Sequence, residues 1–517
     1  MGYARKRAFW GVLWIAGVSL VACKSLPPKA KVPDSHAVDP ASSSLIVRVT
    51  EELMARAPDP EASAHLVIER NAEALAWRLA LIDSVEHSLD FQTYLFHGDV
   101  VGYLIADRIL TAADRGVRVR VLLDDFHLGN DAALVGYDSH PNIEIRIFNP
   151  WAHRKPGLAG NLEMLTHLKR LNTRMHNKSI VADNRMSIVG GRNVGDEYLG
   201  LREIGSYYDL DVLSAGPVAA EVARSFDLYW NSDPVYPASS FSRPGFEDRD
   251  LLAEVREDIA HALGRFEDEL PEFARGEQDW SARFHGLVDR VSYGRAEVVY
   301  DKPVTGPDLP EVNVIESLDQ LTLGAESEVL ATTPFFVPEE ELRVGVDGLT
   351  KRGVRVAAFT NSLASVDSYA AHTGYRPWRK RLLNAGAELY ELRRDAVDLA
   401  PIVTTPPNEP RYVGLHAKFI VVDRKLAYIG SLNLDPRSIY LNTEMGPMID
   451  DPVLAGQLAE IFDRNASGAN SWKVLMDDKG DLDWESDLGV LEWQPARGDM
   501  QRFGAKVMGL LPIKKQL

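Results

Sequence analysis

A duplicated motif constrains the fold of this chain more than any other feature of its sequence. The pattern H-x-K-x4-D occurs at residues 176–183 and again at residues 416–423, 240 positions later. In both copies a G-[GS]-x-N segment follows, and its glycine stands 14 positions after the histidine. Two copies matched at this many positions indicate an internal repeat, so the chain is predicted to fold as two related halves.

The flanking sequence supports the repeat, because strand and helix patterns follow the same order in both halves. The first half is predicted to form a strand, a helix and two further strands at residues 88–96, 100–115, 117–125 and 143–148. The second half is predicted to form strands at residues 328–336, 354–361 and 387–392, with helices ending near residues 352 and 385. Alternating strands and helices predict an α/β fold with two βαβ-rich halves.

The N-terminus has the pattern of a signal peptide over residues 1–22. Three cations at residues 5–7 precede an apolar run at residues 8–22, which is too short to span a hydrocarbon core of roughly 30 Å. The run ends Leu-Val-Ala-Cys at residues 20–23, which resembles the lipobox of bacterial lipoproteins. This resemblance implies cleavage before Cys23 and acylation of its thiol, and a buried Cys23 in an uncleaved helix is the alternative.

The remaining boundaries follow from composition. Residues 23–50 are predicted to form a polar, proline-rich tether that holds the body near a bilayer. Lys24, rather than Asp, follows Cys23, which resembles the signal for transfer to the outer membrane, so the expected location is a membrane-anchored lipoprotein facing the periplasm, in the outer membrane. The two domains are expected at residues 51–240 and 295–470, with a helical insertion at 241–294 and a C-terminal extension at 471–517.

One helical pattern in the C-terminal extension carries apolar residues on a single face. These residues are Met500, Phe503, Val507 and Leu511. The face is predicted to dock onto the body of the protein, and contact with a membrane is the alternative.

Composition narrows the chemistry. The chain has 57 Lys and Arg against 75 Asp and Glu, a formal charge of -18, so its surface repels polyphosphate and no nucleic-acid partner is expected. A single cysteine excludes an internal disulfide framework and a cysteine-ligated zinc cluster. No group of carboxylates or histidines has metal-ligand spacing in the sequence, so neither a metal nor a cofactor is expected.

The spacing within each motif predicts which side chains meet. His176 and Lys178 are two positions apart, so on a strand they project from the same face. Residues 183–185 are typical of a tight turn, and the resulting hairpin brings Asn193 beside His176. The second copy has the same register and contributes His416, Lys418 and Asn433. Each half therefore delivers one imidazole, one ammonium and one carboxamide to a common patch.

Such a set suits displacement at a phosphodiester. The phosphoryl oxygens gain negative charge as phosphorus becomes five-coordinate, and fixed Lys and Asn donors stabilise that charge. One histidine can attack phosphorus while the other protonates the departing alcohol. The two-step route through a phosphohistidine lets an alcohol or water replace the leaving group.

These motifs resemble those of the phospholipase D superfamily over about residues 60–470. Flanking segments at residues 94–99, 190–198, 430–438 and 441–446 are most similar to bacterial cardiolipin synthases, above all the C-type. The resemblance implies two pseudo-twofold-related phospholipase D-like domains with mixed sheets, and an active site at their interface. It also implies catalysis without a metal.

The resemblance assigns roles to individual residues. Both histidines, both lysines and both asparagines are expected to contact the phosphate, with His176 as the nucleophile and His416 as the general acid and base. An acid 25 to 33 positions downstream is expected to orient each histidine: Asp209 for His176, with Glu203 and Asp211 as competitors, and Glu444 for His416.

Four further residues have expected or open roles around the site. Asp183 and Asp423, at the hairpin turns, are expected to brace the backbone, and Ser431 to support the site. Arg192 is either a substrate contact or a salt-bridging strand residue.

The expected activity is transfer of a phosphatidyl group to phosphatidylglycerol, which yields cardiolipin. Phosphatidylethanolamine is a candidate donor if the C-type analogy holds. A phospholipase D-type hydrolase that releases phosphatidic acid and a non-enzymatic lipoprotein scaffold are the alternatives, and a periplasmic nuclease is disfavoured by the negative charge. Whether a partner protein activates the enzyme is left open.

Overall fold

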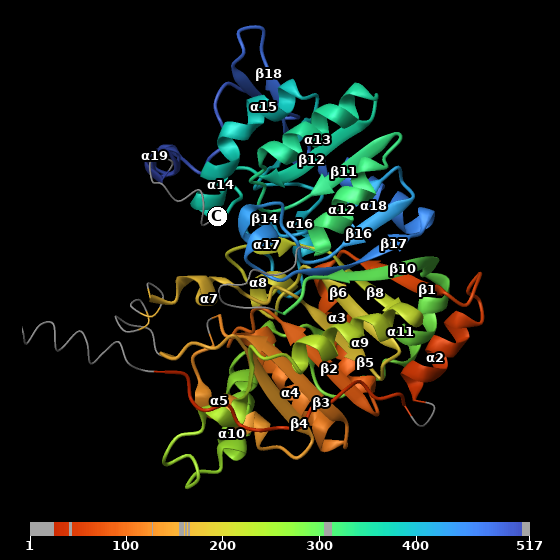
Figure 1. Cartoon of the computed structure of the whole chain (residues 1–517), viewed down its shortest axis with the longest axis vertical. Helices are drawn as coiled ribbons and strands as arrows, with labels where there is room; N and C mark the ends of the chain where they lie inside the picture. Colours follow the sequence, from red (N-terminus) through yellow and green to blue (C-terminus); the bar gives the residue numbers. More distant parts are fainter. Residues whose placement is uncertain are drawn as a thin grey trace, which may run out of the picture.

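The computed structural model describes residues 25–40, 44–126, 128–154, 160, 163, 166–303 and 313–508. Its two halves stack on one another, the N-terminal half below and the C-terminal half above in Figure 1. The predicted signal peptide, Cys23 and Leu511 lie outside the described residues. Among the helices that are described, none has both the length and the apolar content needed to cross a bilayer.

The first half alternates strands and helices as predicted. Its strands are β1 (Ala62–Ile68), β2 (Ser88–Thr93), β3 (Arg118–Asp124), β4 (Ile143–Phe148), β5 (Ser179–Ala182), β6 (Met186–Gly190), β7 (Ser206–Tyr208), β8 (Asp211–Ala215) and β9 (Val235–Pro237). Its main helices are α2 (Leu45–Met54), α3 (Asn71–Ser84), α4 (Val100–Asp114), α5 (Asp131–Asp138), α7 (Leu168–Asn172), α8 (Asp196–Leu199) and α9 (Pro217–Trp230). The predicted helical insertion contains α10 (Leu251–Arg265) and α11 (Ser281–His285).

The second half repeats this order. Its strands are β10 (Ser292–Tyr300), β11 (Glu328–Thr332), β12 (Arg355–Asn361), β13 (Glu388–Leu392), β14 (Val413–Leu415), β15 (Phe419–Val422), β16 (Leu426–Ile429), β17 (Met445–Asp450), β18 (Ser471–Met476), β19 (Leu482–Ser486) and β20 (Gly489–Leu491). Its helices are α12 (Asn313–Leu323), α13 (Glu340–Lys351), α14 (Tyr369–Tyr375), α15 (Arg379–Asn384), α16 (Ala400–Val403), α17 (Pro436–Tyr440), α18 (Pro452–Asn465) and α19 (Asp499–Met508).

All strands except β7 and β14 belong to one mixed sheet of 18 strands. The first half runs β9-β4-β3-β2-β5-β6-β8-β1, and the second half continues β10-β17-β16-β15-β11-β12-β13-β18. The second order is the first one reversed, and antiparallel pairing of β1 with β10 joins the halves. This arrangement confirms two pseudo-twofold-related α/β domains.

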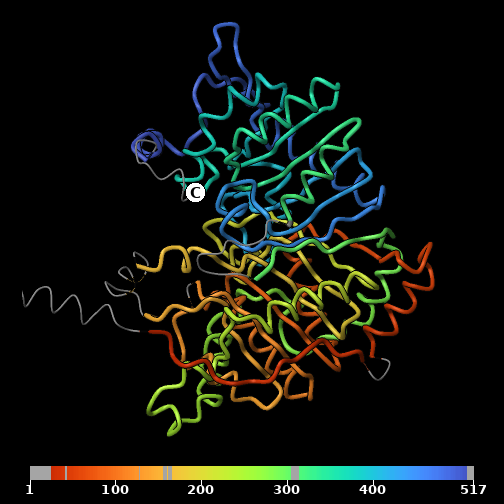
Figure 2. Tube along the Cα trace, in the orientation of Figure 1, coloured from red at the N-terminus to blue at the C-terminus, as the bar shows by residue number. Residues whose placement is uncertain are grey.

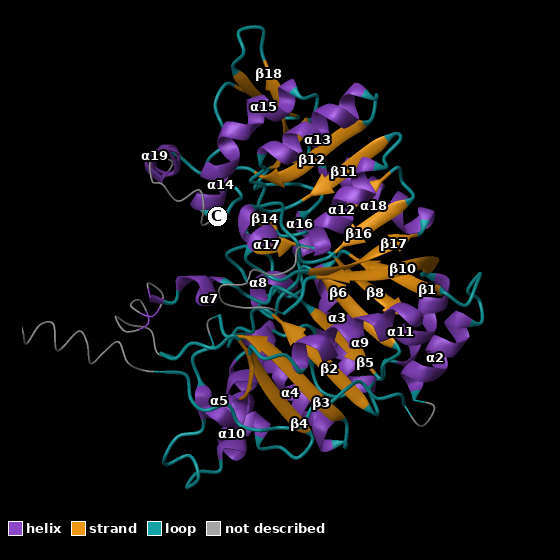
Figure 3. Cartoon of the chain, in the orientation of Figure 1, coloured by secondary structure: helices purple, strands orange, loops and turns teal. Residues whose placement is uncertain are grey.

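Helices cover both faces of each half, as Figure 3 shows. On β5, Ile180 packs into the core beneath α3 and α4, whereas the next residue, Val181, packs with α9. On β15, Ile420 packs with α12 and α13, whereas the next residue, Val421, packs with α18 on the other face. Continuous apolar runs are typical of strands buried on both faces, and they place the two motif hairpins at the centre of the molecule.

The motif hairpins have the predicted register. Ser179 pairs with Val189 in the first, and Phe419 pairs with Ile429 in the second. Two consecutive turn residues in each hairpin have positive φ, which is the geometry of a type I′ turn. The strands are shorter than predicted, since β5 begins at Ser179 and β15 at Phe419. The motif histidines and lysines, His176, Lys178, His416 and Lys418, therefore lie just before these strands.

Two predicted boundaries are wrong. The border between residues 294 and 295 falls inside β10, which is the second-half counterpart of β1, so the second domain begins at Ser292. The described part of the predicted tether is not free either: residues 25–40 run along the first half, as the red trace in Figure 2 shows, and α2 follows with its apolar face in the core.

Arginines of the first sheet hold this N-terminal segment. Arg118, Arg120 and Arg146 donate hydrogen bonds to the backbone carbonyls of residues 36, 35 and 33, at 2.7, 2.9 and 3.0 Å. Residues 33–37 are therefore docked against side chains of β3 and β4, and the Ala37 amide donates to Asp227 at 2.8 Å. These contacts fix the described N-terminal segment to the first domain.

The C-terminal extension also departs from expectation. Its first strand, β18, pairs with β13 and extends the second-half part of the sheet, so residues 471–476 belong to the second domain. In α19 the docked residues are Gln501 and Ala505, which are buried, whereas Met500, Phe503 and Val507 are exposed. The prediction that these apolar residues dock onto the body is wrong.

Candidate active site

The two motifs meet across the junction of the halves, and each histidine is held by the opposite half. The backbone N–H of His176 donates to the carbonyl of Thr443 at 2.9 Å. The backbone N–H of His416 donates to the carbonyl of Tyr208 at 2.8 Å, next to the parallel pairing of β7 with β14. These contacts bring residues separated by more than two hundred positions into one site.

The acids that orient the histidines are those predicted, but the pairing is crossed. Glu444 Oε2 lies 2.8 Å from His176 Nδ1, and Asp209 Oδ2 lies 2.5 Å from His416 Nδ1. The prediction that each acid serves the histidine of its own half is wrong. It fails because β7 ends and β17 begins beside the opposite motif, a relationship that sequence distance does not encode.

The competing acids are excluded by their positions. Glu203 is exposed on the surface. Asp211 is buried, but its carboxylate accepts from Arg78 and Arg192, each at 2.9 Å. Neither carboxylate therefore orients a catalytic histidine.

Hydrogen bonding fixes the tautomer of His176. Its Nδ1 lies 3.1 Å from the carbonyl oxygen of Ser431 as well as 2.8 Å from Glu444. Because a carbonyl oxygen can only accept, Nδ1 carries the proton and Nε2 keeps a free lone pair. Burial, together with the charges of Lys178 and Lys418, lowers the pKa of His176 well below its usual value, which keeps the imidazole neutral.

His416 has a different environment. Burial and the charge of Lys418 lower its pKa to about 4. The Nζ atom of Lys418 lies 2.9 Å from its Nδ1 and 3.1 Å from its Nε2. Among the described residues, no lysine ammonium lies against Nε2 of His176. His176 is therefore the better placed of the two histidines to attack phosphorus.

The pKa values of Glu444 and Asp209 shift in opposite directions. Burial raises the pKa of Glu444 to about 8. Burial acts on Asp209 in the same sense, but the charges of His416 and Lys418 outweigh it and hold its pKa well below the usual range. Asp209 is therefore a fixed negative charge beside His416, which stabilises the imidazolium that forms when His416 takes up a proton.

The lysines supply positive charge next to both imidazoles. Each Nζ donates to the backbone carbonyl of the histidine two positions earlier, at 2.5 Å in both halves. Burial lowers the pKa of Lys178 to about 7 and that of Lys418 to about 8. A phosphodiester anion bound between them favours the charged ammonium forms and raises both pKa values.

The asparagines lie at the positions that the hairpin register predicts. Asn193 Oδ1 accepts from the Leu95 backbone N–H at 3.2 Å. Asn433 Nδ2 donates to Ser438 Oγ at 3.3 Å, while its buried Oδ1 has no partner among the described residues. Since buried polar groups are normally satisfied and an amide oxygen only accepts, Oδ1 of Asn433 keeps capacity for a hydroxyl donor of a substrate.

The supporting residues have the predicted structural roles. Asp183 accepts from the backbone N–H groups of residues 86–88, and Asp423 accepts from those of residues 326–328, so both brace the loop before a parallel strand. The hydroxyl of Ser431 donates to Glu444 Oε2 at 2.5 Å and thereby orients that carboxylate.

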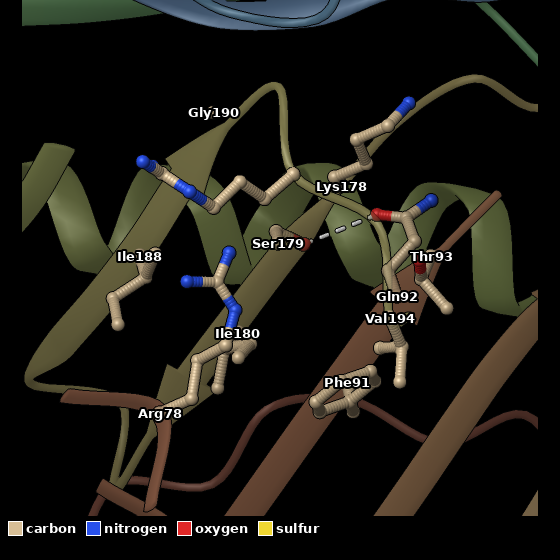
Figure 4. A pocket seen from close by; sticks show the side chains of 11 residues that line it. Arg78, Phe91, Gln92, Thr93, Lys178, Ser179, Ile180, Ile188, Gly190 and Val194 are labelled. Carbon is tan, nitrogen blue, oxygen red and sulfur yellow. Dashed lines mark hydrogen bonds between the residues drawn. The ribbon is translucent and has the colours of Figure 1, made fainter. Parts of the chain in front are cut away.

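Arg192 is structural rather than a substrate contact. Its guanidinium is buried, pairs with Asp211, and donates to backbone carbonyls of residues 68, 69 and 209. Figure 4 shows the small pocket it lines beneath Lys178, together with Arg78, Gln92 and Ser179. The Ser179 hydroxyl donates to Gln92 Oε1 at 3.2 Å there, so this layer packs under the catalytic lysine.

Sequence reasoning missed three tyrosines. The ring of Tyr94 meets His176 edge-on with centroids 5.0 Å apart, and Tyr198 does the same at His416, also at 5.0 Å. Tyr207 lies 5.4 Å from His416 on another side. The available signal for Tyr94 was its place directly after a parallel strand, β2, where functional side chains gather.

The fold also assembles an acidic group that sequence spacing did not predict. His97, Asp99 and Glu197 place one ligand atom each within 4.8 Å of the others. Glu197 raises the pKa of His97, and Asp99 accepts from the backbone N–H groups of residues 102 and 196. These contacts account for the group as an ion pair beside a helix cap.

Comparisons with known proteins agree with this geometry. The profile of the family described as "Cardiolipin synthase, PLD-like domain" matches residues 79–230 and 318–466. Cardiolipin synthase C of Escherichia coli K12 is 34% identical over 461 residues, which cover 86% of this chain and 94% of that protein. An uncharacterised Helicobacter pylori protein is 32% identical over 429 residues, which cover 81% of this chain and 82% of that protein.

The fold is also found in a solved structure. Phosphatidylserine synthase of Haemophilus influenzae superimposes with a TM-score of 0.54 at 14% identity, covering 81% of this chain and 91% of that one. The shared profile, the similarity over most of the chain and the two converging motifs lead to one conclusion. The chain belongs to the cardiolipin synthase family with phospholipase D-like domains, and it is a phosphatidyltransferase-type enzyme of the phospholipase D superfamily.

Proposed function

We propose that this protein makes cardiolipin by transferring a phosphatidyl group to phosphatidylglycerol through a phosphohistidine at His176. The observation that carries the proposal is the crossed pairing of the site, in which His176 depends on Glu444 and His416 depends on Asp209. The pairing holds two imidazoles and two ammonium groups at one place, where a single phosphodiester can bind.

In the first step, Nε2 of His176 attacks phosphorus and the bond from phosphorus to the leaving alcohol breaks. The bound phosphodiester anion and the Asp209 carboxylate favour the imidazolium form of His416, which gives its proton to the departing alcohol and becomes neutral. Lys178 and Lys418 stabilise the charge on the phosphoryl oxygens. Attack uses a free lone pair, which the contact of His176 Nδ1 with the Ser431 carbonyl leaves on Nε2.

In the second step, the glycerol hydroxyl of phosphatidylglycerol gives its proton to His416. The hydroxyl oxygen attacks phosphorus, the bond from phosphorus to His176 breaks, and cardiolipin leaves. Asp209 stabilises the imidazolium of His416 at this stage because its carboxylate lies 2.5 Å from Nδ1. The donor is phosphatidylethanolamine, which releases ethanolamine in the first step.

The proposal includes attachment to a membrane. Acylation of Cys23 after cleavage of the signal peptide tethers the enzyme to the outer membrane on its periplasmic side. This is supported by the cation-rich start of the chain, the apolar run and the small residues before Cys23.

A headgroup experiment tests the proposed reaction. Purified protein is incubated with vesicles of phosphatidylethanolamine and phosphatidylglycerol, each labelled in its glycerol backbone, and the products are separated. The proposal predicts cardiolipin carrying both labels, and release of ethanolamine. Phosphatidic acid as the sole product identifies a hydrolase, and unchanged lipid turnover by a folded His176→Asn variant identifies a non-enzymatic role for this site.

A further inference from the structure

Helix α19 is fixed to the second domain through Gln501 and Ala505. Gln501 Nε2 donates to the Leu363 carbonyl at 2.6 Å, and Ala505 packs against Leu363 and Val366. Just before the helix, Arg497 donates to the carbonyls of residues 364 and 366 at 2.8 and 2.9 Å. These contacts set the rotation of the helix, so its outward face is defined.

The outward face is apolar. Met500, Phe503 and Val507 are 86%, 67% and 45% exposed and occupy one side of the helix, with Trp493 also 56% exposed in the segment before it. A helix whose large apolar residues face the solvent is the reverse of an ordinary surface helix. Clustered exposed apolar residues of this size mark an interaction surface.

The helix stands at the rim of the active site. It docks on the segment 362–368, where Asp367 accepts a hydrogen bond from the Tyr207 hydroxyl at 2.8 Å. Tyr207 in turn lies 5.4 Å from His416, between centroids. A surface that engages α19 is therefore held close to the catalytic centre.

Two observations indicate what binds this face. Exposed cations lie on and beside the helix, at Lys506 and at Arg376 after α14, against a chain whose overall charge is negative. The first described residues, drawn red in Figure 1, begin on the left of the view, which is also the side on which α19 is drawn. Apolar residues bordered by cations suit the interface of a bilayer that contains anionic phospholipid.

We infer that α19 inserts Met500, Phe503 and Val507 into the outer layer of a phospholipid bilayer and holds the active site beside that layer. The inference deepens the proposed function, on which it rests for the lipid nature of the substrate. It adds a second attachment point to the proposed N-terminal anchor. Two attachment points restrict rotation of the enzyme on the membrane, which a single tether does not.

The test places a polarity-sensitive fluorophore at single positions of the full-length lipoprotein bound to vesicles of phosphatidylethanolamine and phosphatidylglycerol. Labelled Met500→Cys and Phe503→Cys proteins are expected to shift to the blue and to be quenched by lipids with spin labels near the headgroups. Labelled Glu257→Cys is the control, because Glu257 is exposed on α10, which Figure 1 draws at the opposite end of the molecule from α19. Equal behaviour of the three probes in the presence of vesicles overturns the inference.

The same probes separate lipid from other occupants. A blue shift at Phe503→Cys in detergent-free solution without vesicles means that the chain's own C-terminus or a second copy covers the face, and either result overturns the inference. Sedimentation distinguishes these two. Probe insertion does not depend on turnover, so the proposed function and this inference fail independently.

A kinetic test adds a functional readout. The double variant Met500→Ser with Phe503→Ser is expected to raise the apparent KM for vesicle substrate about tenfold or more, since apolar contact with the bilayer is lost. Its activity on a soluble short-chain phosphodiester and its melting temperature are expected to remain those of the parent protein. Equal loss on both substrates indicates a structural effect and contradicts the inference.

Discussion

His176 and Glu444 stand 268 positions apart in the chain, yet Nδ1 of the histidine lies 2.8 Å from Oε2 of the glutamate. The reciprocal contact joins His416 to Asp209 at 2.5 Å. Each half thus carries the acid that the other half's histidine requires. Neither half contains a complete histidine and acid pair, so the two domains must assemble before either imidazole is oriented.

The crossed pairing predicts which step each acid affects. Glu444→Gln removes the carboxyl group that holds the nucleophile, His176, and is expected to lower kcat by about a thousandfold or more, as misorientation of a catalytic imidazole does in other enzymes. Pre-steady-state kinetics on a substrate with a good leaving group should show slow formation of the covalent intermediate.

Asp209→Asn is expected to leave formation of that intermediate nearly intact on the same substrate and to slow its breakdown, because His416 acts there as the base. Glu203→Gln is the control, since Glu203 is an exposed acid of the same region. Slow formation with Asp209→Asn and slow breakdown with Glu444→Gln contradict the crossed assignment.

Gly191 leaves room for the Asp209 carboxylate. A Cβ atom at position 191 would lie 2.2 Å from Asp209 Oδ1, so Gly191→Ala must displace the carboxylate from His416. Activity is expected to fall about a hundredfold, with the change mainly in kcat. Gly264→Ala in α10 meets nothing within 4 Å and is expected to keep full activity. Full activity in Gly191→Ala shows that the position of Asp209 does not control the reaction.

Anion binding should depend on pH through the two lysines. The pKa values of Lys178 and Lys418 are about 7 and about 8 without ligand, so both ammonium groups are charged below pH 7 and both are lost as the pH rises past 8. The affinity for inorganic phosphate, measured by calorimetry, is expected to weaken from pH 6 to pH 9. Lys178→Met should remove the part of this dependence centred near pH 7. An unaltered profile in that variant contradicts the assignment of the pH dependence to the two lysines.

His65 makes the junction of the two halves sensitive to acid. It lies on β1, where Nδ1 is 2.9 Å from Ser214 Oγ and Nε2 is 3.2 Å from the Gly294 carbonyl, and burial lowers its pKa to about 4. The unfolded chain takes up a proton near pH 6.5 and the folded chain only near pH 4. The free energy of unfolding should therefore fall between those pH values as acid is added, by up to about 3 kcal/mol.

Urea unfolding at several pH values measures this dependence. His65→Gln has no titrating group at the position, so its unfolding free energy is expected to be lower at pH 7 but flatter between pH 6.5 and pH 4. The same slope in the variant and in the parent protein assigns the acid sensitivity to other groups.

Local rules predicted much of this structure. Strand β4 has the predicted ends, and the hairpin register was correct because two turn residues with positive φ fix the pairing of the strands beside them. The six residues of the duplicated motifs converge because β1 and β10 pair antiparallel at the junction. These features depend on short-range pattern and on the repeat, and both are visible in a single sequence.

Long-range relationships were less predictable. Asp209 and Glu444 were correctly selected, but spacing along the chain cannot tell which half's histidine each acid meets. The docking of residues 33–37 depends on backbone carbonyls, which leave no trace in the side-chain pattern. An apolar helix face predicts burial but does not identify the surface that buries it. The outward orientation of α19 was therefore missed.

The most direct test of the account is the site of covalent phosphorylation in a variant that cannot complete the reaction. His416→Ala is mixed with phosphatidyl-p-nitrophenol, whose leaving group needs no proton from His416, and the burst of p-nitrophenol is measured alongside peptide mapping of the protein. The account predicts a burst of about one equivalent and an acid-labile phosphatidyl group on His176. A burst that persists in His176→Ala, or a label on any other residue, contradicts it.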